Sequence, residues 1–112
     1  MSEPSAPTEE ALFTALGAEV LSTSRLGTGV SDGQKAQLGR GWFKGHLQQI
    51  QSAVCGNKTI EDLATKGDTT ALVAAATPLL GFSPTVAASA TIALLIARIG
   101  VRRICAGEWT ET

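Results

Sequence analysis

The feature that most constrains the fold is a long apolar segment near the C-terminus, Ser83 to Cys105, with the sequence SPTVAASATIALLIARIGVRRIC. No residue between Thr85 and Ala97 is charged. Ser83 can cap a helix, and Pro84 suits the first helical position, where a missing N–H costs nothing. A helix that is apolar on every face must be surrounded. The sequence therefore predicts a central apolar helix, about residues 84–106, enclosed by other helices, by a membrane or by a partner.

Segment lengths favour enclosure by the protein itself over a membrane. A helix of residues 84–97 is about 21 Å long and one of residues 71–80 about 15 Å, whereas a bilayer core is about 30 Å thick. Extension to residue 105 would take three arginines toward the bilayer, each costing about 2.5–3.5 kcal/mol at its centre. The small residues of the segment suit tight helix packing: Ala87, Ala88, Ser89, Ala90 and Ala93.

The remaining patterns are also helical. Thr8 caps a predicted amphipathic helix over residues 9–22, and Ser31 with Gln34 forms a capping box for a long helix that ends at Cys55. Further cap signals begin a short helix at Thr59, which ends by Lys66, and another at Asp68 or Thr69. An apolar helix over residues 71–80 is kinked or shortened by Pro78. We therefore predict an all-α fold: a compact bundle of four to five helices around the central apolar helix.

Three glycines interrupt the long second helix, namely Gly39, Gly41 and Gly45. Each costs about 1 kcal/mol relative to alanine in a helix interior. Two explanations are open. Either the helix breaks near residues 39–41, or Gly41 and Gly45, one turn apart, form a flat face where another helix approaches closely.

Composition indicates one globular domain without a strong electrostatic field. The chain has 112 residues, of which 44% are hydrophobic and 17% charged, and its net charge is −1. We expect a single helical domain over residues 8–107, a flexible N-terminal tail over 1–7 and a C-terminal tail over 108–112. The charge balance argues against nucleic acid as a partner. The N-terminus, MSEPSAPTEE, lacks the basic and apolar regions of a secretory signal, so we expect a cytoplasmic protein.

The two cysteines, Cys55 and Cys105, are expected to be buried structural thiols, because a cytosolic chain normally keeps cysteines reduced. A disulfide is the main alternative. It would close a long loop and contribute about 4 kcal/mol in the chain-entropy model. A redox or metal role is a further alternative.

No residue pattern indicates catalysis, a cofactor or a metal. The segment GRGWFKGH at residues 39–46 could cradle a phosphate, but its spacing matches no known phosphate-binding fingerprint. His46 is the only histidine, and Cys55, nine positions later, would lie on the opposite face of the same predicted helix. We expect His46 to be a partly exposed structural residue. Carboxylates at helix starts are explained by the helix dipole. We therefore predict that the protein is not an enzyme and uses no cofactor and no metal.

The leading functional hypothesis is a small non-catalytic helical protein that acts by protein–protein binding, as an adaptor, accessory subunit or regulator. Its partner would be another protein, possibly a second copy of the chain in a homo-oligomer. The expected contact residues are aromatic anchors and a basic cluster: Trp42, Phe43, Phe82, Arg98, Arg102, Arg103 and Trp109.

The alternative is a membrane-acting effector in which the apolar hairpin of residues 69–105 inserts into a bilayer or lies on it, with the arginines at anionic headgroups. Binding of a small ligand between the helices around His46 is a third hypothesis.

Overall fold

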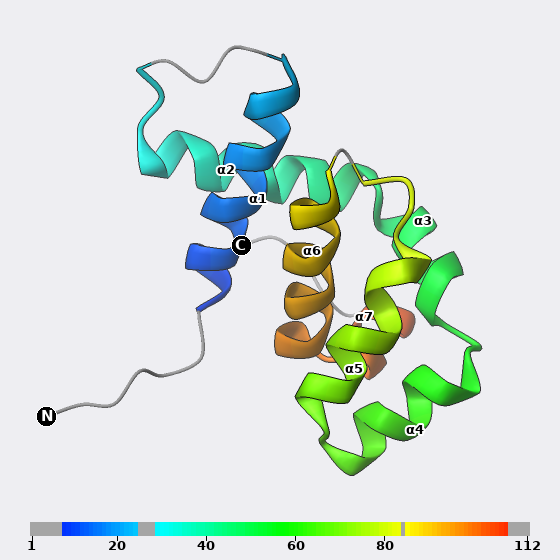
Figure 1. Ribbon diagram of the computed structural model, residues 1–112. Coiled ribbons are helices and arrows are strands. Elements are labelled where there is room, and N and C mark those ends of the chain that lie inside the picture. Colours follow the sequence, from blue (N-terminus) through cyan, green and yellow to red (C-terminus); the bar gives the residue numbers. More distant parts are fainter. Residues whose placement is uncertain (1–7, 25–28, 84, 108–112) are drawn as a thin grey trace, which may run out of the picture.

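The computed structural model describes residues 8–24, 29–83 and 85–107, and the regular structure in these ranges is entirely helical (Figure 1). This confirms the predicted all-α bundle. The described ranges hold seven α-helices, more than the four to five expected, because two predicted long helices are each broken once. In chain order the helical elements are α1 (Glu9–Ser24), α2 (Asp32–Gly45), α3 (Leu47–Val54), α4 (Lys58–Lys66), α5 (Thr69–Ala76), the 3₁₀ turn η1 (Thr77–Leu79), α6 (Val86–Ile99) and α7 (Val101–Cys105).

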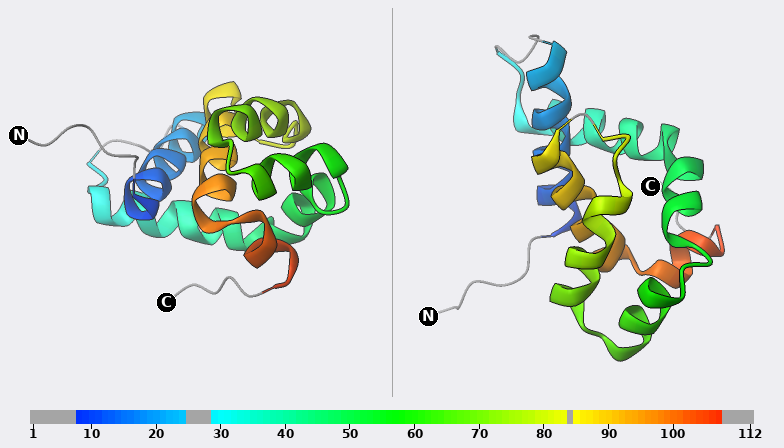
Figure 2. Two further views of the ribbon diagram at one scale, coloured as in Figure 1. Left: turned by 90° about the horizontal axis from the view of Figure 1, so that it is seen from below. Right: turned by 45° about the vertical axis from the view of Figure 1, so that its right-hand side comes forward.

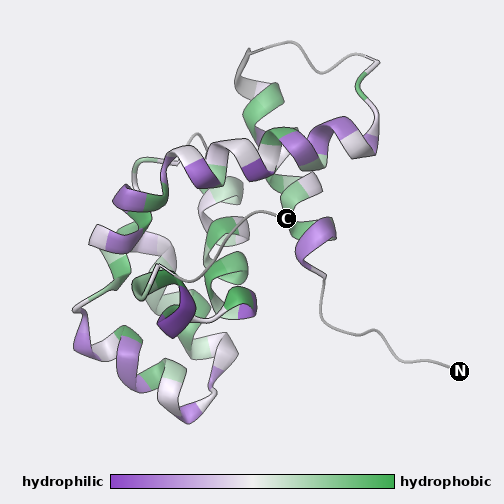
Figure 3. Cartoon of the chain, turned by 180° about the vertical axis from the view of Figure 1, so that it is seen from behind, coloured by the Kyte–Doolittle hydropathy of each residue, from purple (hydrophilic) through white to green (hydrophobic). Residues whose placement is uncertain are grey.

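Helix α6 is the centre of the bundle, as predicted. It lies between α1 and α5 and contacts both (Figures 1 and 2). Its residues are hydrophobic along most of its length (Figure 3), and half of its positions are buried: Ala88, Ser89, Ile92, Ala93, Leu95, Ile96 and Ile99. The one buried hydroxyl among them, on Ser89, donates a hydrogen bond to the Leu80 carbonyl oxygen at 3.1 Å. A polar group on this helix is thus satisfied inside the core.

Both ends of α6 differ from the prediction. The N-cap is Thr85 rather than Ser83, because the Thr85 Oγ1 accepts the Ala88 N–H at 2.9 Å while the Ser83 hydroxyl donates to the Leu80 carbonyl at 2.6 Å. Pro84, the predicted first helical residue, lies outside the described residues. At the other end, Gly100 has φ 109° and ψ 127°, a backbone conformation reserved for glycine. The predicted continuous helix over 84–106 is therefore wrong, and α7 is a separate short helix.

The predicted helix from residue 31 to Cys55 is also two helices. The break lies at His46, with φ −110° and ψ 14°, and not at residues 39–41. Both the His46 N–H and the His46 ring nitrogen Nδ1 lie within hydrogen-bond distance of the Trp42 carbonyl oxygen, at 3.0 and 2.8 Å. The ring thus contacts the last helical carbonyls at the point where the chain changes direction.

Helices α1 and α2 pack with their backbones in contact. A Cβ atom added to Gly39 would lie 2.0 Å from the Phe13 carbonyl oxygen, and one added to Gly17 would lie 1.9 Å from that of Lys35. The close approach predicted for Gly41 and Gly45 is wrong, because a Cβ at either position would meet nothing within 4 Å. The contact instead requires Gly17 and Gly39, and α2 is unbroken at residues 39–41, so neither explanation offered for the glycines is correct.

Most helix ends follow their local sequence signals. The capping box of Ser31 and Gln34 is present, the Thr8 hydroxyl accepts the Ala11 N–H, and Asp68 caps α5. Pro78 lies in η1 and ends α5. The predicted cap at Thr59 is wrong, because Asn57 caps α4 two residues earlier.

Cys55 and Cys105 form a disulfide, with their Cα atoms 5.7 Å apart. The expectation of two free thiols is therefore wrong. The break at Gly100 sends α7 back toward the end of α3, where the Gln51 side chain donates a hydrogen bond to the Ile104 carbonyl at 2.8 Å. This return of the chain brings together two cysteines that are 50 positions apart.

Candidate functional site

Three rings from two parts of the chain form a partly exposed aromatic stack. The His46 imidazole lies on the Trp42 indole, with ring centroids 4.0 Å apart and an angle of 16° between the planes. The Phe82 ring is nearly parallel to both, 6.2 Å from Trp42 and 6.3 Å from His46. All three side chains are neither buried nor fully exposed. We refer to Trp42, His46 and Phe82 as the aromatic stack.

Local backbone structure explains why these rings meet. Trp42 and His46 are one helical turn apart at the end of α2, so their side chains share a face. Phe82 comes from the turn between η1 and α6. The Ser83 N–H and hydroxyl both donate to the Leu80 carbonyl, at 3.1 and 2.6 Å, and fix this turn. Because Pro78 ends α5, the chain turns after η1 and places Phe82 against the α2–α3 junction.

A shallow groove of about 510 Å³ adjoins the stack. Phe82 and Leu79 line it from one side, and residues of α3 line it from the other: Gln48, Gln49, Ser52 and Ala53. None of these side chains is charged. The amide and hydroxyl groups can each donate and accept hydrogen bonds.

Two apolar side chains beside Phe82 in sequence are exposed. Leu79 is 37% exposed and Val86 is 84% exposed. Val86 occupies the first position of α6, where Thr85 holds the helix start against α1 through a 2.8 Å hydrogen bond from its hydroxyl to the Glu19 carboxylate. The segment between η1 and α6 thus exposes apolar side chains, and the Thr85–Glu19 hydrogen bond fixes its backbone to α1.

The structure divides the expected aromatic anchors. It brings Trp42 and Phe82 together in the stack. Phe43 is fully buried and packs edge-on against Phe13, with ring centroids 5.7 Å apart, so it belongs to the core. Trp109 lies outside the described residues. The expectation that His46 is partly exposed is confirmed.

The three arginines of the basic cluster are all exposed. In the continuous helix predicted over residues 84–106, Arg98 and Arg102 would be one turn apart and would share a face. The break at Gly100 places Arg98 on α6 and Arg102 with Arg103 on α7. The two ion pairs within the described ranges, Lys35–Asp32 and Arg40–Glu10, involve none of the three.

The cysteines and the histidine are both engaged in the described structure. Both cysteines are in the disulfide, and the His46 ring stacks on Trp42. In residues 8–24, 29–83 and 85–107 no group of three or more His, Cys, Asp or Glu side chains could hold a metal ion.

Sequence reasoning missed the role of His46 in the stack and all the α3 residues of the groove. The one available signal was the spacing of Trp42 and His46, which places their rings on one helix face. No known protein family, curated protein or solved structure matches this chain.

Proposed function

We propose that this is a small non-catalytic helical protein that acts by binding another protein through the aromatic stack and the adjoining groove. The observation that carries the proposal is the stack itself, three rings held in parallel and left partly exposed. Aromatic side chains that are rigidly placed and half-covered are typical energetic anchors of protein interfaces.

The lining of the groove indicates the chemistry of the partner. An apolar side chain of the partner would lie against Phe82 and Leu79, and its backbone or amide groups would pair with Gln48, Gln49 or Ser52. The described residues that line the groove include no cationic side chain, whereas binding to nucleic acid depends on Lys and Arg contacts to phosphate. A polypeptide segment with apolar anchors fits this surface best.

The test combines crosslinking with matched variants. A photoreactive amino acid at position 86 should crosslink one protein partner in cells, and Phe82→Ala should abolish that crosslink. With the purified partner, Phe82→Ala should weaken binding by about thirty-fold or more, the range of an interface hot spot. Leu38→Ala is the matched control, since Leu38 is a 36% exposed leucine on α2 that lines neither stack nor groove, and it should bind like the parent protein.

Other outcomes would contradict the proposal. If Phe82→Ala and Leu38→Ala lower affinity equally while circular dichroism shows both folded, the stack is not the contact surface. A chain that self-associates, and becomes monomeric with Phe82→Ala, would identify a second copy as the partner. A strict monomer with no crosslinked protein would exclude protein binding at this surface.

The membrane-acting alternative requires a large rearrangement. No described helix is long and apolar enough to cross a membrane. Insertion of the hairpin would remove the buried side chains of α6 from their contacts with α1 and α5. Flotation with anionic phosphatidylserine vesicles separates the two functions: we expect the protein to stay at the bottom of the gradient, and flotation with dye leakage would favour the effector.

The cytoplasmic location stays a prediction. The disulfide argues against it, because such bonds persist mainly in oxidising compartments. Alkylation of free thiols in cells, before lysis, would report the state of Cys55 and Cys105 where the protein resides.

A further inference from the structure

A second cavity lies at the opposite end of α6 from the aromatic stack. It has a volume of about 650 Å³ and is bounded by α4, the start of α5 and the α6–α7 junction. Phe82 precedes the first turn of α6, whereas Ala97 and Val101 of this cavity flank its last turn. A helix of this length spans about 21 Å, so the two sites are separate. The volume is within the range of pockets that hold small organic ligands.

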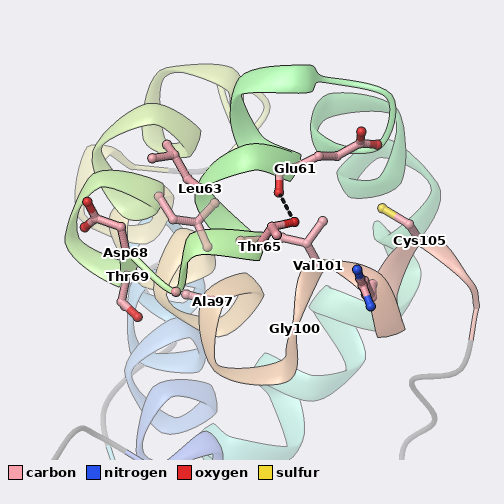
Figure 4. Close-up of a pocket in the computed structure, with 13 residues that line it drawn as sticks. Glu61, Leu63, Thr65, Asp68, Thr69, Ala97, Gly100, Val101 and Cys105 are labelled. Atoms are coloured by element: carbon pink, nitrogen blue, oxygen red, sulfur yellow. Dashed lines mark hydrogen bonds between the residues drawn. The ribbon is translucent and has the colours of Figure 1, made fainter.

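The floor of the cavity is apolar. Leu72 and Val101 are each 4% exposed, and Leu63, Ala64 and Ala97 extend this surface as partly exposed side chains. Figure 4 shows Leu63, Val101 and Ala97, with Thr65 beside them, between Asp68 and Thr69 on one side and Glu61 and Cys105 on the other. A ligand that covers this floor needs an apolar body.

The rim carries opposite charges that do not neutralise each other. Glu61 and the exposed Arg102 both line the cavity, yet the described residues contain no ion pair between them. The Glu61 Oε2 accepts the Gly56 N–H at 3.2 Å, which holds the carboxylate at the rim and leaves Oε1 available. Asp68 lies on the other side of the apolar floor, where its Oδ1 accepts the Ala71 N–H and caps α5 (Figure 4).

We propose that this cavity binds a small zwitterion with an apolar body, its ammonium at Glu61, its carboxylate at Arg102 and its apolar part on Leu72 and Val101. A ligand with only negative charge would face Glu61 and Asp68, and one with only positive charge would face Arg102. A zwitterion satisfies both signs with charge-assisted hydrogen bonds. Apolar amino acids and short apolar peptides with free termini belong to this class. The proposal does not depend on protein binding at the aromatic stack.

Binding is tested with the oxidised full-length protein and a set of matched probes. Leucine, leucyl-leucine and leucyl-leucyl-leucine are titrated while amide chemical shifts are followed by NMR. The best of the three should saturate in the submillimolar to millimolar range and shift the amides of Leu63, Gly100 and Val101. Its N-acetyl derivative, which lacks the ammonium, and its C-terminal amide, which lacks the carboxylate, should each bind at least about ten-fold more weakly.

Two variants locate the two charges, and three further variants are controls. Glu61→Gln keeps an acceptor for Gly56 and should weaken binding of the zwitterion at least about ten-fold, and Arg102→Gln should do the same. Asp62→Asn and Arg103→Gln alter exposed neighbours that do not line the cavity, and both should bind like the parent. Phe82→Ala should also bind the zwitterion normally, which separates this site from the protein-binding surface.

Three results would overturn the proposal. The first is that none of the three probes binds at millimolar concentrations. The second is that the acetylated and amidated probes bind as tightly as the zwitterion. The third is that Glu61→Gln and Arg102→Gln bind the zwitterion like Asp62→Asn and Arg103→Gln while their spectra show an intact fold.

Discussion

At the scale of single residues, the contact between α1 and α2 depends on the absence of two side chains. Gly17 and Gly39 are both buried, and each lies against a carbonyl oxygen of the opposite helix. Any Cβ at these positions would overlap main-chain atoms, which cannot move aside as the end of a flexible side chain can. The two helices would have to separate.

We therefore expect Gly39→Ala to destabilise the protein by about 3 kcal/mol, the upper end of the range for overpacking. Gly41→Ala is the control on the same helix. Its Cβ would meet nothing within 4 Å, so the higher helix propensity of alanine should stabilise the protein by about 0.5–1 kcal/mol. Urea unfolding followed by circular dichroism measures both. Equal effects of the two substitutions would contradict the backbone contact.

Sequence reasoning succeeded at this scale where a signal is local. The caps at Ser31 and Asp68 depend only on residues within one helical turn. Ser31 was predicted, and Asp68 was one of the two caps predicted for α5. The choice among Gly39, Gly41 and Gly45 depends on which face of α2 meets α1. Amphipathic spacing alone did not identify that face, and Gly39 entered the sequence analysis only as part of a possible helix break.

At the scale of the helices, the break at Gly100 determines the direction of the chain after α6. The Gly100 φ of 109° is unfavourable for any residue with a Cβ. If alanine occupied this position, the backbone would be strained or the chain would continue as a longer α6. Continuation would carry α7 away from α3 and α4.

Gly100→Ala should accordingly cost about 1–3 kcal/mol of unfolding free energy. Gly81→Ala is a suitable control, because a Cβ there meets nothing within 4 Å and no left-handed backbone is required. The two unfolding free energies are compared in the oxidised protein. A Gly100→Ala variant as stable as Gly81→Ala would show that the break tolerates a side chain.

The apolar pattern predicted α6 as the central helix, because a helix of thirteen successive uncharged residues must be surrounded by other apolar groups. It did not predict where the helix would stop. Isolated glycines are tolerated inside helices at modest cost, and only the packing of Val101 and Ile104 into the core explains why the chain turns at Gly100.

At the scale of the whole molecule, the disulfide holds α7 to the end of α3. A loop closed across 50 positions should contribute about 4 kcal/mol to stability in the chain-entropy model. We expect the double variant C55S/C105S to lose about this amount relative to the oxidised parent in urea unfolding. Dithiothreitol should lower the stability of the parent similarly and leave the double variant unchanged. A reductant effect on both proteins would assign the loss to another cause.

The candidate site is a property of this scale as well. Residue type alone predicted Trp42 and Phe82 as anchors, since exposed aromatics favour interfaces. The contact of these two rings with His46 depends on the α2–α3 break and on the turn after Pro78. The exact position of neither feature could be predicted from the sequence. Phe43 was assigned to the same surface because the sequence alone did not show that Trp42 and Phe43, which are adjacent, lie on different faces of α2.

The disulfide also divides the chain into a ring and an arm. The ring runs from Cys55 to Cys105 and contains α4, α5, α6 and α7, while α1, α2 and α3 belong to the arm that precedes Cys55. A protease that cuts one peptide bond inside the ring leaves a single covalent molecule, whereas a cut in the arm releases a fragment. The turn that presents Phe82 lies inside the ring, so even a nick there would leave both of its halves attached to the same protein.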